Sequence, residues 1–568
     1  MPSIIENASP LTNFTTVADV LPSNVLSGSR LSYYVAISAV LLCVWLFQPA
    51  KQKCGVSAPF YKASRLKWMF SADTLIKDSY SKFRDAVYQI KTTEGVRTII
   101  PASLVGELKG LPEDTLSART AVREAMLSEY TKLCAGQHSD TLSLLLKCKM
   151  TGQLARMTPQ LKEELEYIIG TEFPECEEWT PFKIQPFMIR TISRLSGRVF
   201  VGPALNRVEE WMDVSINFAV TAFIAVIKLQ FFPPWMRPVA QYLVSELRTI
   251  DRDLEKAQAM LTPIIEERIR DSETPGYEEP DDFVQWLLDA LPDDQKRDFY
   301  IQGKVQLLLS AASIHTTSNL TTDCIYDLAV HQDMQEILRE EAREVLEDEE
   351  AWGKKDSMSR LKKLDSFIKE SQRLSGNVTS FIRKVMKPID LSDGTHLPAG
   401  TSLLAPMAGV AVDPRYYPDP DVFDGLRFWK LRQQQQQQQS SNTSGSSSPT
   451  TATTPCSSTT SLVTSDLLAN APCSNNPNNS NNPPGSGRWQ FTSISDAAMN
   501  FGLGKHACPG RFFAASEIKM VLAYLLLNYD VRLRDGEGRP PPNMFMMTRS
   551  PSTTAEVLFR RRSAAASS

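Results

Sequence analysis

The chain has 568 residues, 42% of them hydrophobic, and a formal net charge of −4. This apolar fraction is ample for a large buried core. The near balance of 61 basic and 65 acidic residues argues against nucleic acid as a main partner, because phosphate binding needs a concentrated positive field. The five histidines show no zinc spacing such as HExxH, which argues against a protein-ligated zinc site.

The N-terminal region contains one segment that could cross a membrane. Residues Leu31 to Gln48 are uncharged, and a helix of that length spans about 27 Å, close to the hydrocarbon thickness of a bilayer. Lys51 and Lys53 follow directly, so the positive-inside tendency places the rest of the chain in the cytosol. We predict a lumenal tail over 1–30 and one transmembrane anchor over 31–48. A cleaved signal peptide is the less favoured alternative, because the apolar run starts late and lacks a charged region before it.

The body of the chain has mainly helical patterns. Apolar and charged positions recur at helical spacing in residues 158–170, 252–271 and 334–350. Short strand-like runs occur at Val96–Pro101, Phe381–Met386 and Gly400–Pro406. The sequence therefore predicts a mainly α fold with small β-sheets.

A long apolar helix is predicted over residues 304–329, with a polar centre. This centre contains Ala312, Ser313, His315 and Thr316. The Thr316 hydroxyl can bond back to its own helix, as is common for threonine in apolar helices. It can instead pass protons through water to a reacting group. The sequence leaves both readings open.

Glu370 and Arg373 stand three residues apart in "FIKESQRL", so an acid and a guanidinium can pair on one helix face. In isolation such a pair is usually an ordinary surface contact. Here a strand-like run with Arg383 follows it, and Arg427 lies downstream in "FDGLRF".

The composition changes abruptly at Gln433. Residues 433–439 are all glutamine, and Asp466 is the only charged residue from there to Gly487. Such a segment buries too little apolar surface to offset its ordering entropy, so we predict that 433–487 is disordered. Because closure entropy grows slowly with loop length, we expect it to interrupt one domain formed by 49–432 and 488–562, with a tail over 563–568.

The stretch "NFGLGKHACPGRFFAA", residues 500–515, holds a single cysteine, Cys508, in a glycine-rich loop. A lone thiolate suits haem iron, because the porphyrin supplies four bonds and the protein need supply only one axial ligand. Glycines let the backbone approach a flat cofactor and aim N–H groups at the sulfur. The N-terminus of the helix predicted after the loop, over 511–529, would stabilise the thiolate.

The pattern Phe501-Gly502-x-Gly504-x-His506-x-Cys508-Pro509-Gly510-Arg511 resembles the haem-binding signature of the cytochrome P450 family. The resemblance covers roughly residues 61–561, apart from the insert. It implies the family's helix-rich haem domain with small sheets, and haem b ligated by the Cys508 thiolate. It also implies that Phe501 packs on the porphyrin and that His506 reaches a haem propionate.

The same resemblance assigns roles upstream of the loop. Glu370, Arg373 and Arg427 are expected to lock the fold around the haem. Arg383 occupies a place where the family often binds a propionate. His315 stands where most members have an acid on the oxygen side of the haem, next to Thr316 as the proton-relaying hydroxyl.

A finer resemblance concerns residues 179–202, 206–218, 231–244 and 314–318. These segments are similar to fungal tailoring oxygenases such as ent-kaurene oxidases, indole-diterpene oxygenases and polyketide hydroxylases. The resemblance implies a monooxygenase of the endoplasmic reticulum membrane that oxidises a bulky apolar secondary metabolite with O2. NADPH-cytochrome P450 reductase would supply the electrons.

The expected substrate pocket uses residues 308–316, 378–382 and the segment around Met546. Basic contacts to an acidic redox partner are expected from Lys505, Arg511 and Lys519. Two alternatives stay open. The first is a peroxygenase or redox-neutral isomerase of the same fold, because the acid beside Thr316 is missing. The second is a non-catalytic membrane haem protein.

Overall fold

The computed structural model describes residues 55–354, 356–443 and 486–562. The predicted lumenal tail, the predicted anchor and most of the insert therefore lie outside the described residues. The longer helices are α2 (Arg65–Lys82), α7 (Thr151–Glu172), α8 (Ile184–Phe200), α9 (Glu209–Gln230), α11 (Ser245–Asp271), α13 (Phe299–Val330), α14 (Gln332–Val345), α17 (Lys362–Ser375), α19 (Arg427–Thr443) and α20 (Arg511–Asn528). The shorter ones include α3 (Ala102–Leu108), α4 (Ala118–Ala125), α5 (Ser128–Thr131), α6 (Ser139–Leu145), α10 (Arg237–Ala240), α12 (Phe283–Ala290), α15 (Glu349–Gly353), α16 (Ser357–Arg360) and α18 (Met407–Ala411).

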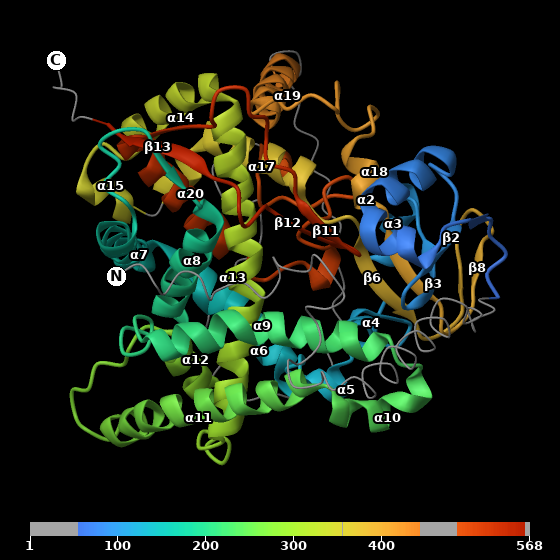
Figure 1. The fold of residues 1–568 in the computed structure, drawn as a ribbon, viewed down its shortest axis with the longest axis horizontal. Helices are drawn as coiled ribbons and strands as arrows, with labels where there is room; N and C mark the ends of the chain where they lie inside the picture. Colours follow the sequence, from blue (N-terminus) through green and yellow to red (C-terminus); the bar gives the residue numbers. More distant parts are fainter. Residues whose placement is uncertain (1–54, 355, 444–485, 563–568) are drawn as a thin grey trace, which may run out of the picture.

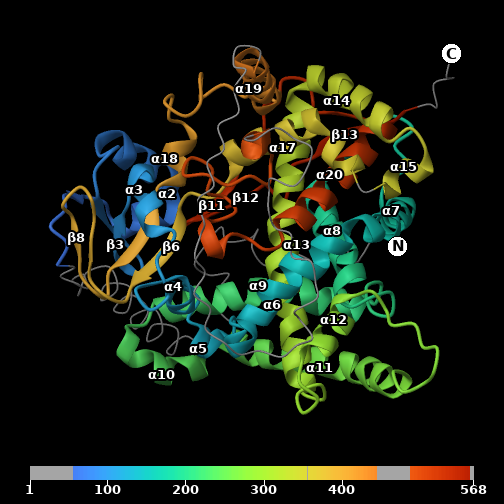
Figure 2. The same cartoon turned by 180° about the vertical axis from the view of Figure 1, so that it is seen from behind.

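Helix α13 crosses the middle of the molecule, as both views show (Figures 1 and 2). It begins where the Asp298 side chain accepts a hydrogen bond from the Ile301 N–H at 3.0 Å, a typical N-cap. Its residues are mostly apolar, and α8, α9, α11, α17 and α20 all pack against it. The predicted helix over 304–329 is thus confirmed, and it forms the axis of the helical core.

The predicted helical segments of the body are also confirmed. Residues 158–170 lie in α7, residues 252–271 in α11, and most of residues 334–350 in α14. Each is amphipathic, with an apolar face that packs into one large helical cluster, so burial of that face stabilises the helix.

A six-stranded sheet lies on the side of the molecule away from α14 and α15 (Figure 1). Its strand order is β1 (Phe60–Tyr61), β2 (Tyr88–Thr92), β3 (Gly95–Ile99), β9 (Ser402–Ala405), β6 (Ser380–Val385) and β4 (Leu116–Ser117). The three predicted strand-like runs are therefore confirmed, and they become the adjacent strands β3, β9 and β6. Two apolar clusters form beside this sheet and hold it to α2 and α3.

Three small sheets complete the fold. They are β10 (Tyr529–Arg532) with β13 (Val557–Arg561) and β5 (Thr180–Phe182), the hairpin of β11 (Asn543–Phe545) and β12 (Thr548–Ser550), and the pair β7 (Ile389–Asp390) and β8 (His396–Leu397). The β11–β12 hairpin matters for the site, because its turn at Met546 reaches back to α2. The Met546 N–H donates to the Met69 carbonyl oxygen at 2.7 Å.

The glutamine run differs from its prediction. Helix α19 continues from Arg427 to Thr443, so the predicted disorder is wrong for residues 433–443. Glutamine has a good helix propensity, and a helix already nucleated by the preceding residues is extended at little cost. Residues 444–485 lie outside the described residues, and Ser486 begins a 3-10 turn that ends at Trp489.

Among the described residues, α9 is the one helix that is long and apolar enough to cross a membrane. Half of its apolar stretch is buried against neighbouring helices, as in a helix of a protein core.

Candidate functional site

The Cys508 loop is a tight turn that favours glycine at two positions. The Cys508 N–H donates to the Phe501 carbonyl oxygen at 2.7 Å and closes the loop. Gly502 and Gly504 have φ angles of 70° and 62°, in the left-handed region. A Cβ on Gly504 would lie 2.6 Å from the Lys109 carbonyl oxygen, so a side chain there would push the loop off the sheet side of the molecule.

The Cys508 sulfur lies at the start of α20. Burial raises the pKa of the Cys508 thiol, whereas the backbone N–H groups of Gly510 and Arg511 donate to the sulfur and oppose that shift. The Arg511 guanidinium also lowers this pKa and donates to the Cys508 carbonyl oxygen at 2.8 Å. These donors favour the thiolate, and a metal cation bound to the sulfur would complete its deprotonation.

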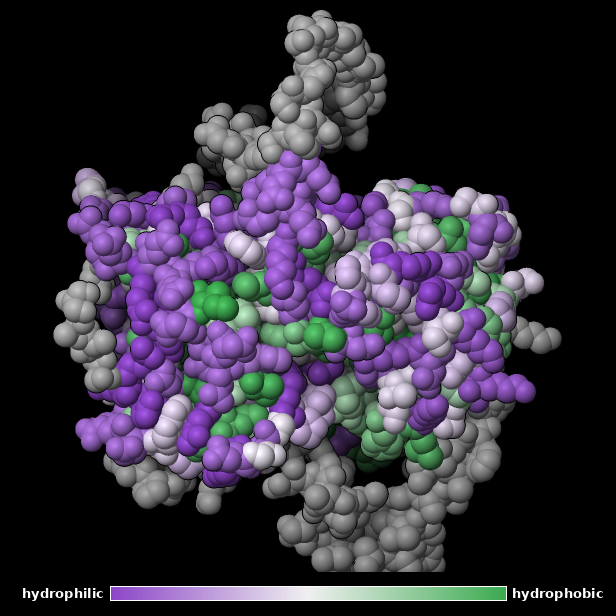
Figure 3. Space-filling model, turned by 90° about the horizontal axis from the view of Figure 1, so that it is seen from above, coloured by the Kyte–Doolittle hydropathy of each residue, from purple (hydrophilic) through white to green (hydrophobic). Residues whose placement is uncertain are grey.

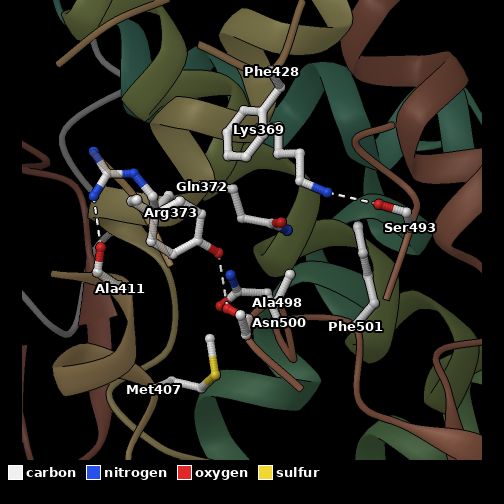
Figure 4. Close-up of a pocket in the computed structure, with 12 residues that line it drawn as sticks. Lys369, Gln372, Arg373, Met407, Ala411, Phe428, Ser493, Ala498, Asn500 and Phe501 are labelled. Carbon is white, nitrogen blue, oxygen red and sulfur yellow. Dashed lines mark hydrogen bonds between the residues drawn. The ribbon is translucent and has the colours of Figure 1, made fainter. Parts of the chain in front are cut away.

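Hydrogen bonds from β6 and its preceding turn hold the entry to this loop. Ser380 Oγ donates to the Met499 carbonyl oxygen at 2.7 Å, and the Asn377 N–H donates to Asn500 Oδ1 at 3.2 Å. Figure 4 shows Asn500 and Phe501 facing the same small pocket as Arg373 and Met407. The loop is therefore built onto the end of α17 and the sheet.

The structure brings Glu370, Arg373 and Arg427 together in a buried ion-pair network. Arg373 Nε donates to Glu370 Oε2 at 2.9 Å, and Arg427 Nε donates to Glu370 Oε1 at 3.1 Å. The Glu370 side chain is fully buried, and these two guanidiniums together with the Asp424 N–H at 3.0 Å compensate its charge. The remaining donors of both guanidiniums bind backbone carbonyls of residues 411–422, including Ala411 at 2.6 Å (Figure 4). The network thus ties α17 to the loop before α19.

The centre of α13 carries a small exposed face. Ala312 and Thr316 are exposed, four residues apart, while Ile314 and Thr317 beside them are buried. Positions i and i+4 share one helix face, so an opening must lie over this point of the central helix. The Thr316 hydroxyl donates to the Ala312 carbonyl oxygen at 2.8 Å, which is the back-bonded state, and its lone pairs stay accessible.

His315 does not share this face. Its Nε2 lies 2.8 Å from the Ile216 carbonyl oxygen on α9, and burial lowers the pKa of the imidazole. The neutral ring therefore donates to α9 rather than toward Thr316. A role for His315 as a proton donor on the oxygen side of the haem stays a prediction, which this contact with α9 does not support.

Arg383 and His506 lie in one electrostatic neighbourhood with Glu113. Arg383 is buried, and it donates a hydrogen bond to the neighbouring Ile382 carbonyl oxygen at 2.9 Å. Burial lowers the pKa of Arg383 to about 10, and the Glu113 charge opposes the shift. His506 Nε2 lies 2.6 Å from Glu113 Oε1, and the pKa of His506 is lowered by burial and by the Arg383 charge.

A haem group fits these residues. Arg383 forms no ion pair with a carboxylate among the described residues, so a propionate would satisfy a buried cation. The exposed face at Ala312 and Thr316 would accept a flat ring, and Cys508 would supply the axial thiolate. Glu113 was not identified from the sequence, which has no local signal that joins it to His506 at a distance of 393 residues along the chain.

Two of the three predicted pocket segments meet in the structure. Val378 and Ile382 pack in one apolar cluster with Met544 and Met547 of the β11–β12 hairpin. Thr379 Oγ1 donates to the Met547 sulfur at 2.9 Å. In the third segment, residues 308–316, Leu309 packs in the helical core, whereas Ala312 and Thr316 form the exposed face of α13.

The three basic residues expected at a redox partner differ in exposure. Lys505 is exposed, and Arg511 is half-buried beneath the loop. Lys519 is buried, with Nζ 2.7 Å from Asp365 Oδ1 and donating to the Met358 carbonyl oxygen at 2.9 Å. Its expected partner contact is therefore wrong: the charge on α20 faces the core because Asp365 of α17 neutralises it there.

Comparison with known proteins identifies the family. The family model described as Cytochrome P450 matches residues 138–444 and 476–559. Cytochrome P450 monooxygenase braC of Annulohypoxylon truncatum is 30% identical over 541 residues, covering 94% of this chain and 98% of its own. Cytochrome P450 monooxygenase olcJ of Penicillium canescens is 32% identical and covers 95% of each chain. Ent-kaurene oxidase of Gibberella intermedia is 30% identical, with 93% of each chain covered.

A solved structure shares the fold. Retinoic acid bound cyanobacterial CYP120A1 superposes with a TM-score of 0.60 at 16% identity, covering 89% of this chain and 99% of that one. The shared fold, the Cys508 loop and the fungal relatives all indicate the same family. The chain therefore belongs to the cytochrome P450 family and is a haem-thiolate monooxygenase, an oxidoreductase.

Proposed function

We propose that this monooxygenase oxidises a bulky apolar secondary metabolite, such as a terpenoid, an indole-diterpene or a polyketide, with O2 and electrons that a reductase delivers from NADPH. Support comes from the fungal relatives, one of which is named ent-kaurene oxidase. The apolar and methionine side chains at Val378, Ile382, Met544 and Met547 also suit a hydrophobic ligand.

The Cys508 loop carries this proposal. Bound haem would supply oxygen activation, which the protein itself cannot perform. Cys508 would hold the iron through its thiolate, and the N–H groups of Gly510 and Arg511 would tune the sulfur. Arg383 and His506 would hold the propionates, and the Thr316 hydroxyl would pass a proton to the reacting oxygen.

We place the protein at the endoplasmic reticulum membrane, with its body in the cytosol. Beyond the apolar segment 31–48, the short helices after α9 expose large apolar side chains. Trp235, Val239, Tyr242 and Leu243 are 72–78% exposed around α10, which lies on the edge of the molecule opposite α19 (Figure 1). The face with α14, α18 and α19 is instead mostly hydrophilic, with scattered apolar spots (Figure 3). The α10 edge therefore suits the lipid surface and the α19 face suits water.

The first test is the carbon monoxide difference spectrum of the reduced protein in microsomes. A strongly red-shifted Soret band is expected, and Cys508→Ser should abolish it while leaving the protein folded. A wild-type band in Cys508→Ser would refute the thiolate assignment. Product formation from ent-kaurene and other apolar metabolites is then measured with reductase, NADPH and O2. Turnover that needs only peroxide, and not reductase, would favour the peroxygenase alternative.

A further inference from the structure

A buried carboxyl group on α20 is connected to the centre of α13 through two hydroxyls. Ser196 Oγ, on α8, lies 2.9 Å from Glu517 Oε1 and 2.9 Å from Ser313 Oγ. Glu517 and Ser196 are essentially inaccessible to solvent. Three helices that are distant in sequence thus meet in one unbroken chain of hydrogen bonds.

The chain ends beside the exposed face of the central helix. Ser313 and Thr316 are three residues apart on α13, and Thr316 Oγ1 lies 3.4 Å from the Ser313 carbonyl oxygen. Ser313 is only partly buried, so one water can join its hydroxyl to the Thr316 hydroxyl. With such a water, the chain would reach from an internal acid to the exposed face at Thr316, whereas His315 points the other way.

Glu517 has the protonation state that a donor needs. Burial raises the pKa of Glu517 to about 8, and the hydrogen bond with Ser196 opposes that shift. The group is therefore a neutral acid at physiological pH. Its second oxygen, Oε2, is buried without a hydrogen-bond partner among the described residues, so it is the end open to an internal water.

We propose that Glu517, Ser196 and Ser313 form a proton-delivery chain that serves Thr316 during monooxygenation. This inference rests on the monooxygenase activity. The Glu517 proton passes to Ser196 Oγ, the Ser196 hydroxyl proton passes to Ser313 Oγ, and the Ser313 proton passes through water to the Thr316 face. Glu517 is left as a carboxylate and takes up a solvent proton at Oε2 through an internal water. The carboxyl group then turns about its Cγ–Cδ bond, so that the protonated oxygen again faces Ser196, and the hydroxyls rotate back. No electrons move within the chain, and each cycle transfers one proton.

Infrared spectroscopy of the haem-loaded resting protein tests the chain without turnover. At neutral pH we expect the C=O stretch of a protonated carboxylic acid, absent from Glu517→Gln. Ser196→Ala should shift this band to higher frequency, because the carboxyl loses its hydrogen bond. Two matched controls should leave it unchanged: Ser193→Ala, one turn earlier on α8, and Ser318→Ala, on α13. Absence of the band from the wild-type protein, or its persistence in Glu517→Gln, would overturn the proposal.

Turnover with reductase gives the second readout, as peroxide released per NADPH oxidised. Glu517→Gln, Ser196→Ala and Ser313→Ala should each raise this ratio several-fold with a normal carbon monoxide spectrum. Ser313→Thr, which keeps the hydroxyl, and both controls should keep the wild-type ratio. A wild-type ratio in Glu517→Gln would refute the relay whatever the serine variants do. Loss of the carbon monoxide band in the wild-type protein would instead refute the monooxygenase site and leave the infrared result standing.

Discussion

Arg427 Nε donates to Glu370 Oε1 at 3.1 Å, although 57 positions separate the two residues in the chain. Glu370 also accepts from Arg373 of its own helix, so one carboxylate bridges two guanidiniums in a site closed to water. A buried carboxylate of this kind destabilises the fold little while it is paired, but it destabilises the fold strongly once a partner is removed. The network therefore makes the position of the loop before α19 depend on a single side chain of α17.

Replacing Glu370 should consequently unfold the region around the haem. Glu370→Gln leaves two buried guanidiniums facing one neutral amide, and we expect a loss of about 3–5 kcal/mol in the free energy of unfolding. Thermal denaturation and haem content of purified protein measure this. The control is Lys430→Ala, which removes a partner from the exposed pair with Asp424 and should cost about 1 kcal/mol or less. Equal stability of the two variants would contradict the role of the network.

Thr316→Ala should uncouple electron flow from product. The substitution removes the accessible hydroxyl at the exposed face of α13 but keeps the helix, because the lost hydrogen bond is only a back-bond to Ala312. We expect a normal carbon monoxide spectrum, a fall in product per NADPH of about tenfold or more, and peroxide in its place.

Thr322→Ala is the control for this experiment. Thr322 makes the same kind of back-bond on the same helix, to the Ser318 carbonyl oxygen at 2.8 Å, but it is fully buried. It should keep wild-type coupling. Equal uncoupling in both variants would show that the effect comes from the helix and not from the Thr316 hydroxyl.

Local patterns predicted much of this molecule, and long-range contacts account for the rest. Strands β3, β6 and β9 follow from residue patterns within a few positions, so the sequence alone indicates them, whereas the buried role of the Glu370–Arg373 pair was implied by the family resemblance. The orientation of His315 depends on the Ile216 carbonyl, 99 residues away on α9. The burial of Lys519 depends on Asp365 in the same way. The periodicity of a sequence does not show which distant residue a side chain will contact, because that partner depends on how the helices pack.

His315 should influence stability and not proton delivery. Burial holds its pKa below 6.5, so when the pH falls below that value the unfolded chain binds a proton before the folded one does. The free energy of unfolding then decreases as the solution is acidified through the range below 6.5. His315→Gln keeps a donor for the Ile216 carbonyl but cannot titrate. When the pH is lowered, the free energy of unfolding of this variant should therefore decrease less than that of the wild-type protein. Denaturant unfolding at a series of pH values measures this.

Coupling in His315→Gln should stay at the wild-type level, since the ring faces α9. His315→Ala, which leaves the Ile216 carbonyl without its donor, should cost about 1–3 kcal/mol in stability with coupling still intact. Peroxide release from His315→Gln that matches Thr316→Ala would contradict the orientation seen here and restore the histidine as a proton donor.

Substitutions of Lys505 and Lys519 should have different effects: the first should change docking of the redox partner, and the second should change stability. Lys505 is exposed on the Cys508 loop, so Lys505→Glu should weaken docking of an acidic reductase, most at low ionic strength, with haem content and stability unchanged. Lys519→Ala instead removes one of the two cations that Asp365 pairs with in the core; Arg432 and the Phe491 N–H at 2.8 Å remain, and the loss should cost about 1–3 kcal/mol. The measurements are the reductase concentration for half-maximal turnover and the unfolding midpoint. A salt-dependent docking defect in a stable Lys519→Ala protein would show that this lysine reaches the surface. Unchanged docking in Lys505→Glu would show that the reductase binds another face of the protein.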